Sequence, residues 1–162
     1  MEGIAIGSDE PLQIDREELA LRMSAPKVAE DLAAIGLRSP DHLLATFVAA
    51  DDRLKVFLGD TPSITDNRPR LEYYNLYPVK PISVAEIRIL RETIGPYLQG
   101  IQQESEALEK ARQVVDAIWQ EHEATTLGNK AAALSTIETA LRLEPHNAYL
   151  QFLARKQGTV NN

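Results

Sequence analysis

Apolar positions along most of this chain recur at the three- and four-residue spacing of an amphipathic helix. Short stripes of this kind follow one another through residues 15–59, and longer ones run through residues 83–155. Serine or aspartate precedes most stripes and glycine ends several, which are the usual start and stop signals of helices. The pattern therefore predicts a mainly α fold of several small helices followed by a helical hairpin or bundle.

The first half of the chain predicts four short helices. Asp15 and Glu18 have the spacing of a capping box. Proline at the first helical position predicts two further starts, at Pro26 and Pro40, and Asp51 predicts the cap of a fourth helix. Each helix is too short to be stable alone, so we expect its apolar face to pack on a neighbour. In the second helix that face is formed by Val28, Leu32 and Ile35.

The opening of the chain departs from helical spacing. Residues 3–8 read Gly-Ile-Ala-Ile-Gly-Ser, which predicts a short buried strand that ends at Gly7. One strand cannot satisfy its own backbone hydrogen bonds, and the rest of the chain offers almost no partner strand. We therefore expect this chain to begin inside a larger protein.

The second half predicts longer helices. Ser83 and Glu86 form a second capping box, and the stripe that follows is interrupted at Gly95-Pro96 before it resumes as far as Gly128. Further helices are expected over about 130–143 and around Leu150. The proline-punctuated segment around Pro78 predicts a boundary between domains 1–78 and 79–162. The polar tail that closes the second domain is expected to be disordered.

The composition of the chain limits the classes of function that it is expected to have. The net charge of −7 and the pI near 5.0 disfavour an extended nucleic-acid surface, which needs clustered Lys and Arg. No apolar run approaches the roughly 20 residues of a membrane-spanning helix. The absence of cysteine excludes disulfides and thiolate chemistry. We expect a cytoplasmic protein, or a part of one that faces the cytoplasm.

Candidate chemistry is sparse. The histidines His42, His122 and His146 lack a second histidine or a carboxylate at the spacing of a helical metal site. There is no nucleophile elbow, phosphate loop or dinucleotide fingerprint. The sequence therefore predicts no catalytic residue, no cofactor and no metal site within the chain.

Residues 64–77 are the least regular segment and hold three of the five tyrosines. Asp66, Arg68, Glu72 and Tyr73 are compatible with a recognition loop, because arginine forks and tyrosine rings are common contact groups. They are also compatible with an intrachain clasp, which is the interpretation that we favour. Trp119 is a further candidate interaction residue.

Several pieces occur in an order that resembles one known family. They are Ile-Ala-Ile-Gly-Ser at 4–8, Leu-Leu-Ala-Thr-Phe at 43–47, Phe-Leu-Gly-Asp at 57–60 and Thr-Asp-Asn-Arg-Pro-Arg-Leu-Glu-Tyr at 65–73. They are similar to the C-terminal region of bacterial spermidine synthase-like proteins, although Asn67 stands where that family has a second aspartate.

The resemblance implies that residues 4–6 are the last strand of a methyltransferase-like catalytic domain. The residues that hold the aminopropyl donor and the polyamine lie upstream of this region in the family. This chain is then a non-catalytic accessory region of a polyamine aminopropyltransferase-like protein, and its partner is that catalytic domain or another protein.

A second likeness covers residues 128–147, which look like the second helix and exit turn of a tetratricopeptide repeat. The alternative hypothesis is therefore a tetratricopeptide-like protein-interaction module. It requires an exposed apolar groove after Ser83, and burial of Leu108, Val115, Trp119 and Ile137 in one monomer would argue against it. Self-association into a homo-oligomer is a third hypothesis.

Overall fold

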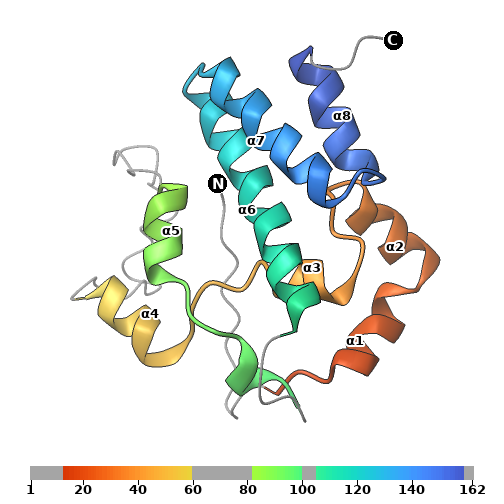
Figure 1. Cartoon of the computed structure of the whole chain (residues 1–162). Coiled ribbons are helices and arrows are strands. Elements are labelled where there is room, and N and C mark those ends of the chain that lie inside the picture. Colours follow the sequence, from red (N-terminus) through yellow and green to blue (C-terminus); the bar gives the residue numbers. More distant parts are fainter. Residues whose placement is uncertain (1–12, 60–81, 100–104, 159–162) are drawn as a thin grey trace, which may run out of the picture. The chain divides into compact units, whose positions relative to one another are not determined.

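The computed structural model describes residues 13–59, 82–99 and 105–158, and these residues are predominantly helical (Figure 1). The helices are α1 (Arg16–Met23), α2 (Pro26–Ala33), α3 (Pro40–Leu44), α4 (Asp51–Leu58), α5 (Val84–Leu90), α6 (Glu106–Thr126), α7 (Lys130–Leu143) and α8 (Ala148–Gln157). A 3-10 turn, η2, covers Gly95–Tyr97. The prediction of a mainly α fold is confirmed. The strand expected at 3–8, the segment 64–77 and the boundary near Pro78 lie outside the described residues.

The chain forms two compact units. Unit 1 combines Met1–Phe47 with Thr93–Asn162, and unit 2 is Val48–Glu92. The apolar stripe that begins after Ser83 is consequently two separate helices rather than one kinked helix. Helix α5 ends at Leu90 in unit 2, whereas α6 belongs to unit 1 and begins at Glu106, where the side chain of Ser105 caps it.

Helix starts follow the local signals closely. The capping box of Ser83 and Glu86 is complete, because each side chain accepts a hydrogen bond from the other residue's backbone N–H. At α1 only half of the box forms: Asp15 caps the helix, while the carboxylate of Glu18 accepts from Arg22. The fourth helix starts one residue earlier than predicted, since Ala50 is its N-cap.

Two apolar clusters form the core of unit 1, and α6 contributes to both. The first joins α3, α6 and the segment around η2 through Leu44, Ala45, Ile94, Leu98, Leu108, Ala111 and Val115. The second joins α6, α7 and α8 through Val114, Ala117, Ile137, Ala140, Leu150, Leu153 and Ala154. Burying two faces of one helix makes α6 the central support of this unit.

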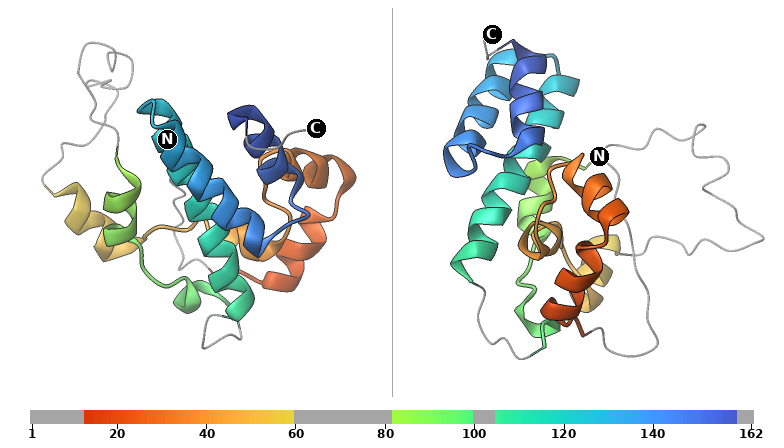
Figure 2. Two further views of the ribbon diagram at one scale, coloured as in Figure 1. Left: turned by 45° about the horizontal axis from the view of Figure 1, so that its top comes forward. Right: turned by 90° about the vertical axis from the view of Figure 1, so that its right-hand side faces the viewer.

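Helices α6, α7 and α8 pack together as a group of neighbouring helices (Figures 1 and 2). Small side chains at the contacts, including Ala133, Ala140 and Ala154, are buried and let the helix axes approach closely. The helices predicted over 130–143 and around Leu150 are confirmed. Among the residues that the structure describes, no helix is long and apolar enough to cross a membrane.

The N-terminal segment of unit 1 is tied to η2 by a short parallel bridge between Ile14 and Leu98. The Ile14 N–H donates to the carbonyl of Tyr97 at 2.7 Å, and the Gln99 N–H donates to the carbonyl of Ile14 at 3.0 Å. This bridge anchors the start of α1 to a part of the chain far away in sequence.

Unit 2 contains α4 and α5. Arg53 of α4 donates from Nη2 to the carbonyl of Ile89 at 2.7 Å and from Nε to that of Leu90 at 3.0 Å. A cation at this position satisfies the last carbonyls of α5 and complements the helix dipole. Glu92 accepts from the Ala50 N–H at 2.8 Å, which ties the ends of the unit together.

Candidate functional site

The polar chemistry of unit 1 is concentrated where α3 meets the turn between α7 and α8. His42 is buried, with 6% of its surface exposed. Its Nδ1 lies 2.8 Å from the Oγ of Ser39, the N-cap of α3, and its Nε2 lies 2.9 Å from Oε1 of Glu144 at the end of α7. In the second contact the two atoms lie close together without the alignment of a hydrogen bond. We call Ser39, His42, Glu144 and Asn147 the His42 network.

The neighbouring contacts favour one tautomer of His42. The Ser39 oxygen already accepts from the backbone N–H of His42 at 3.3 Å, so its own hydroxyl proton is available to Nδ1. With Nδ1 as an acceptor, the neutral ring carries its proton on Nε2, facing the Glu144 carboxylate. We assign this tautomer from the contacts on the two ring nitrogens.

Asn147 extends the network to α2 and α8. Its side chain is almost fully buried and donates to Oε2 of Glu144 at 2.9 Å and, more weakly, to the carbonyl of Gly36 at 3.5 Å. Its Oδ1 accepts from the N–H groups of Tyr149 and Leu150, which caps α8. One amide therefore connects the loop after α2, the end of α7 and the start of α8.

Two arginines near the His42 network donate further hydrogen bonds between separate segments of unit 1. Arg16 donates to Oδ2 of the largely buried Asp41 at 2.6 Å. Arg38 donates to the carbonyl of His146 at 2.7 Å. The first contact joins α1 to α3, and the second joins the segment after α2 to the turn between α7 and α8, so the polar groups of this region connect separate segments.

The order serine, histidine, glutamate is also that of a nucleophile, a base and a residue that orients the base. Here the chemistry argues for packing. A nucleophile needs an approach for its substrate, whereas the ring of His42 is enclosed and the hydroxyl of Ser39 caps a helix. The two grooves described below are lined by other residues.

The surface feature closest to this network is a groove between α2 and α8. It has a volume of about 290 Å³ and is lined by Ala33, Ala34, Ala148, Tyr149 and Phe152. We call it the α2–α8 groove. Its lining is overwhelmingly apolar, and Phe152 keeps 51% of its surface exposed. The rings of Tyr149 and Phe152 stack with their centroids 6.3 Å apart, which presents a rigid aromatic edge.

Helix α2 adds to this apolar surface. None of its eight residues is buried, although its sequence predicts a strongly amphipathic helix. Val28 remains 42% exposed, and Ile35, just after the helix, is 52% exposed. The apolar face expected at Val28, Leu32 and Ile35 is thus only partly packed within unit 1: Leu32 is half-buried, and Val28 and Ile35 keep much of their surface exposed.

Burial also perturbs Tyr149 on this surface. Desolvation raises the pKa of the Tyr149 phenol above 10.0, and the negative charge of Glu121 raises it further. Glu121 itself is buried on α6, where Oε1 accepts from Thr125 at 2.9 Å and from Gln157 at 2.8 Å. The α2–α8 groove therefore lies beside a phenol that resists ionisation.

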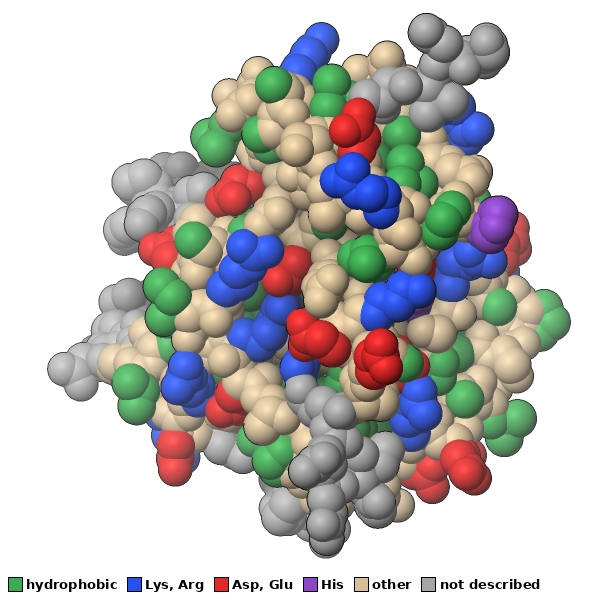
Figure 3. Space-filling view, viewed as in Figure 1, with side chains coloured by type: hydrophobic (Ala, Val, Ile, Leu, Met, Phe, Trp, Pro, Cys, Tyr) green, Lys and Arg blue, Asp and Glu red, His purple; other side chains and the backbone are tan. Residues whose placement is uncertain are grey.

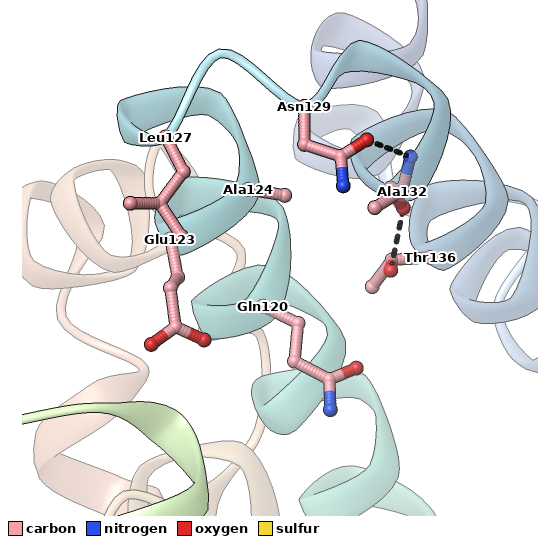
Figure 4. A pocket seen from close by; sticks show the side chains of 7 residues that line it. All are labelled: Gln120, Glu123, Ala124, Leu127, Asn129, Ala132 and Thr136. Carbon is pink, nitrogen blue, oxygen red and sulfur yellow. Dashed lines mark hydrogen bonds between the residues drawn. The ribbon is translucent and has the colours of Figure 1, made fainter.

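A second groove lies at the far end of the helical hairpin, between the end of α6 and the start of α7 (Figure 4). It has a volume of about 320 Å³ and is lined by Gln120, Glu123, Ala124, Leu127, Asn129, Ala132 and Thr136. Asn129 caps α7 through the Ala132 N–H, and the Thr136 hydroxyl donates to the Ala132 carbonyl. Leu127, 76% exposed, is the main apolar contact point of an otherwise mixed surface.

The structure describes only some of the residues that the sequence predicts to mediate interactions. Asp66, Arg68, Glu72 and Tyr73 lie outside the described residues. Trp119 is half-buried on α6 and packs against the first apolar cluster. Leu108, Val115 and Ile137 are three of the four residues whose joint burial would argue against the tetratricopeptide-like hypothesis, and they are buried in the core of unit 1, whereas the fourth, Trp119, is only half-buried.

Sequence reasoning missed the His42 network because its members are far apart in the chain. The one local signal was Ser39-Pro40 as a helix start, which places Ser39 beside His42 but gives no hint of Glu144. Within the described ranges, no cluster of histidine, aspartate and glutamate has the arrangement of a metal site. On the face shown in Figure 3, basic side chains are interspersed with acidic ones rather than gathered in one field.

Comparisons with protein-family models, with curated proteins and with solved structures found no match to this chain.

Proposed function

We propose that this chain is a non-catalytic accessory module that acts by contacting protein through the α2–α8 groove. The observation that carries this proposal is the exposure of the groove's apolar lining. An amphipathic helix with no buried residue, placed beside an exposed aromatic side chain, is typical of a surface that another protein covers. Aromatic anchors of this kind dominate the binding energy of many interfaces.

The polar groups of the unit support a non-catalytic role. His42, Glu144 and Asn147 are occupied with one another and with helix caps, and their side chains leave little room for a substrate. The resemblance to the C-terminal region of spermidine synthase-like proteins suggests the setting: an accessory region that serves an aminopropyltransferase-like catalytic domain.

Two measurements test the proposal. The purified chain is assayed for aminopropyl transfer from decarboxylated S-adenosylmethionine to putrescine, and we expect no turnover; clear turnover would exclude a non-catalytic role. Sedimentation then follows protein association of the chain, alone and mixed with a spermidine synthase-like catalytic domain. Phe152→Ser is expected to weaken association, whereas Leu21→Ser, an exposed apolar position on α1, serves as the matched control.

A tetratricopeptide-like interaction module is the second candidate, and the groove of Figure 4 is the observation that favours it. In that case the partner lies against the end of α6 and the start of α7. Leu127→Ser would then weaken association, and Phe152→Ser would leave it unchanged. The two variants therefore separate the two candidate surfaces.

A further inference from the structure

We infer that the partner of the α2–α8 groove is a second copy of this chain, related by a two-fold axis that passes through the groove. This inference rests on the proposed function and names the partner of the same surface. Three features of the groove support it: its shape, its charges and the directions of its two helices.

The shape of the surface is self-complementary. Ala33, Ala34 and Ala148 have small side chains and form a hollow, while Phe152 stands at its edge, half-exposed. A two-fold interface requires a projection and a matching recess on the same surface. Phe152 of each copy supplies the projection, and the alanine-lined hollow of the other copy supplies the recess.

The charges beside the groove are also self-complementary. One turn before Ala33 and Ala34, α2 carries Glu30 and Asp31 with Lys27 as their counter-ion, so two carboxylates share one ammonium. One turn after Phe152, α8 carries Arg155 and Lys156, both exposed. We call Glu30 and Asp31 on α2 the acidic arm of this surface, and Arg155 and Lys156 on α8 its basic arm.

The two arms leave the groove in roughly opposite directions, as Figure 1 shows for α2 and α8. A half-turn about an axis through the groove exchanges these directions. It places the acidic arm of one copy against the basic arm of the other, twice in each dimer. Opposite charges that face each other across an interface fix its register and disfavour other pairings.

A charge-swap experiment tests this arrangement in the full chain. Sedimentation equilibrium is expected to show a dimer that weakens with added salt. Glu30→Lys with Asp31→Lys, or Arg155→Glu with Lys156→Glu, places like charges together and is expected to weaken the dimer about tenfold or more. The chain that carries all four substitutions restores opposite charges at both contacts and is expected to regain the dimer. Circular dichroism checks that each variant is folded.

The outcomes separate this inference from the proposed function. Rescue by the four-substitution chain supports the two-fold pairing. A chain that stays monomeric at its highest soluble concentration overturns the pairing, as does a dimer that Phe152→Glu leaves intact. If the monomer nevertheless binds the catalytic domain through Phe152, the proposed function stands while the second copy is excluded. If the chain associates with neither, both proposals fall.

Discussion

His42 of α3 and Glu144 at the end of α7 approach within 2.9 Å in the interior of unit 1. The contact joins the first helices of the chain to its last ones, and Asn147 and Ser39 complete the polar connection on either side. Because His42 and Asn147 are buried, they depend on protein partners for the hydrogen bonds that water would otherwise supply.

Replacing Glu144 by alanine should destabilise the protein by about 2 kcal/mol, because it removes an acceptor of the buried Asn147 amide and the carboxylate that faces Nε2 of His42. Urea unfolding followed by circular dichroism measures the change. Glu138→Ala, an exposed position on the same helix, is the control and should have little effect. Adding His42→Ala to Glu144→Ala should cost less than the sum of the two single changes. Simple additivity would show that the two side chains are not coupled.

Asn147→Ala should lower the free energy of unfolding by about 2 kcal/mol, since the amide both caps α8 and bonds to Glu144 in a buried setting. Asn129→Ala removes an equivalent cap from α7 at an exposed site and should cost about 1 kcal/mol or less. Comparing the denaturation midpoints isolates the contribution of burial. Equal losses would mean that Asn147 acts only as a cap.

Gly36→Ala should destabilise by about 1–3 kcal/mol, because the residue has a φ of +85° and an added Cβ would lie 3.0 Å from Tyr149 and 3.1 Å from Ile118. Gly128→Ala is the matched control. Its φ is +71°, but a Cβ there meets nothing within 4 Å. The difference between the melting temperatures of the Gly36→Ala and Gly128→Ala variants measures the effect of the close packing around Gly36. Equal melting temperatures would show that Tyr149 and Ile118 move aside without cost.

Tyr149 should make the protein sensitive to alkali. Burial raises the pKa of its phenol in the folded state, with Glu121 adding to the shift, whereas the unfolded residue ionises near pH 10. The unfolded state therefore loses this proton first. The associated stability is complete below about pH 10 and is lost as the pH rises through the folded-state pKa.

Urea unfolding at increasing pH tests this effect against Tyr149→Phe, which has no phenol to ionise at this position. The wild-type protein should lose stability above pH 10 more steeply than the variant. Glu121→Gln should lessen the difference, because it removes the charge that adds to the shift. Parallel pH profiles of the wild type and the Phe variant would contradict the predicted role of Tyr149.

Local signals in the sequence predicted the helices well, but they gave no information on contacts between distant segments. Ser83 with Glu86 and proline at Pro40 specify helix starts through neighbours within one turn, so the sequence is sufficient. The approach of Glu144 to His42 depends on how whole helices pack, and no spacing rule encodes it. The stripe after Ser83 also continues beyond α5 into a different unit, because periodicity indicates an apolar face but not which core that face joins.

The same lack of long-range information explains why the exposure of the apolar side of α2 could not be predicted from the sequence. Amphipathicity correctly predicted α2 as a helix with one apolar side, but whether that side is buried depends on neighbours far along the chain. Val28 and Ile35 remain exposed because the packing of unit 1 leaves that side open. An apolar helix face that stays exposed is a candidate functional surface, because the local sequence pattern favours burial whereas the packing of the whole unit leaves the face open.

Unit 1 brings together Met1–Phe47 and Thr93–Asn162, and this has a consequence during protein synthesis. The ribosome delivers α1, α2 and α3 long before α7 and α8 exist, so the early helices leave the exit tunnel without the segments that complete their packing. His42 must stay hydrated on the nascent chain until Glu144 has been translated. Unit 1 can therefore fold fully only after α8 has been translated, and termination before that point would release a chain with exposed apolar surface for chaperones or proteases to recognise.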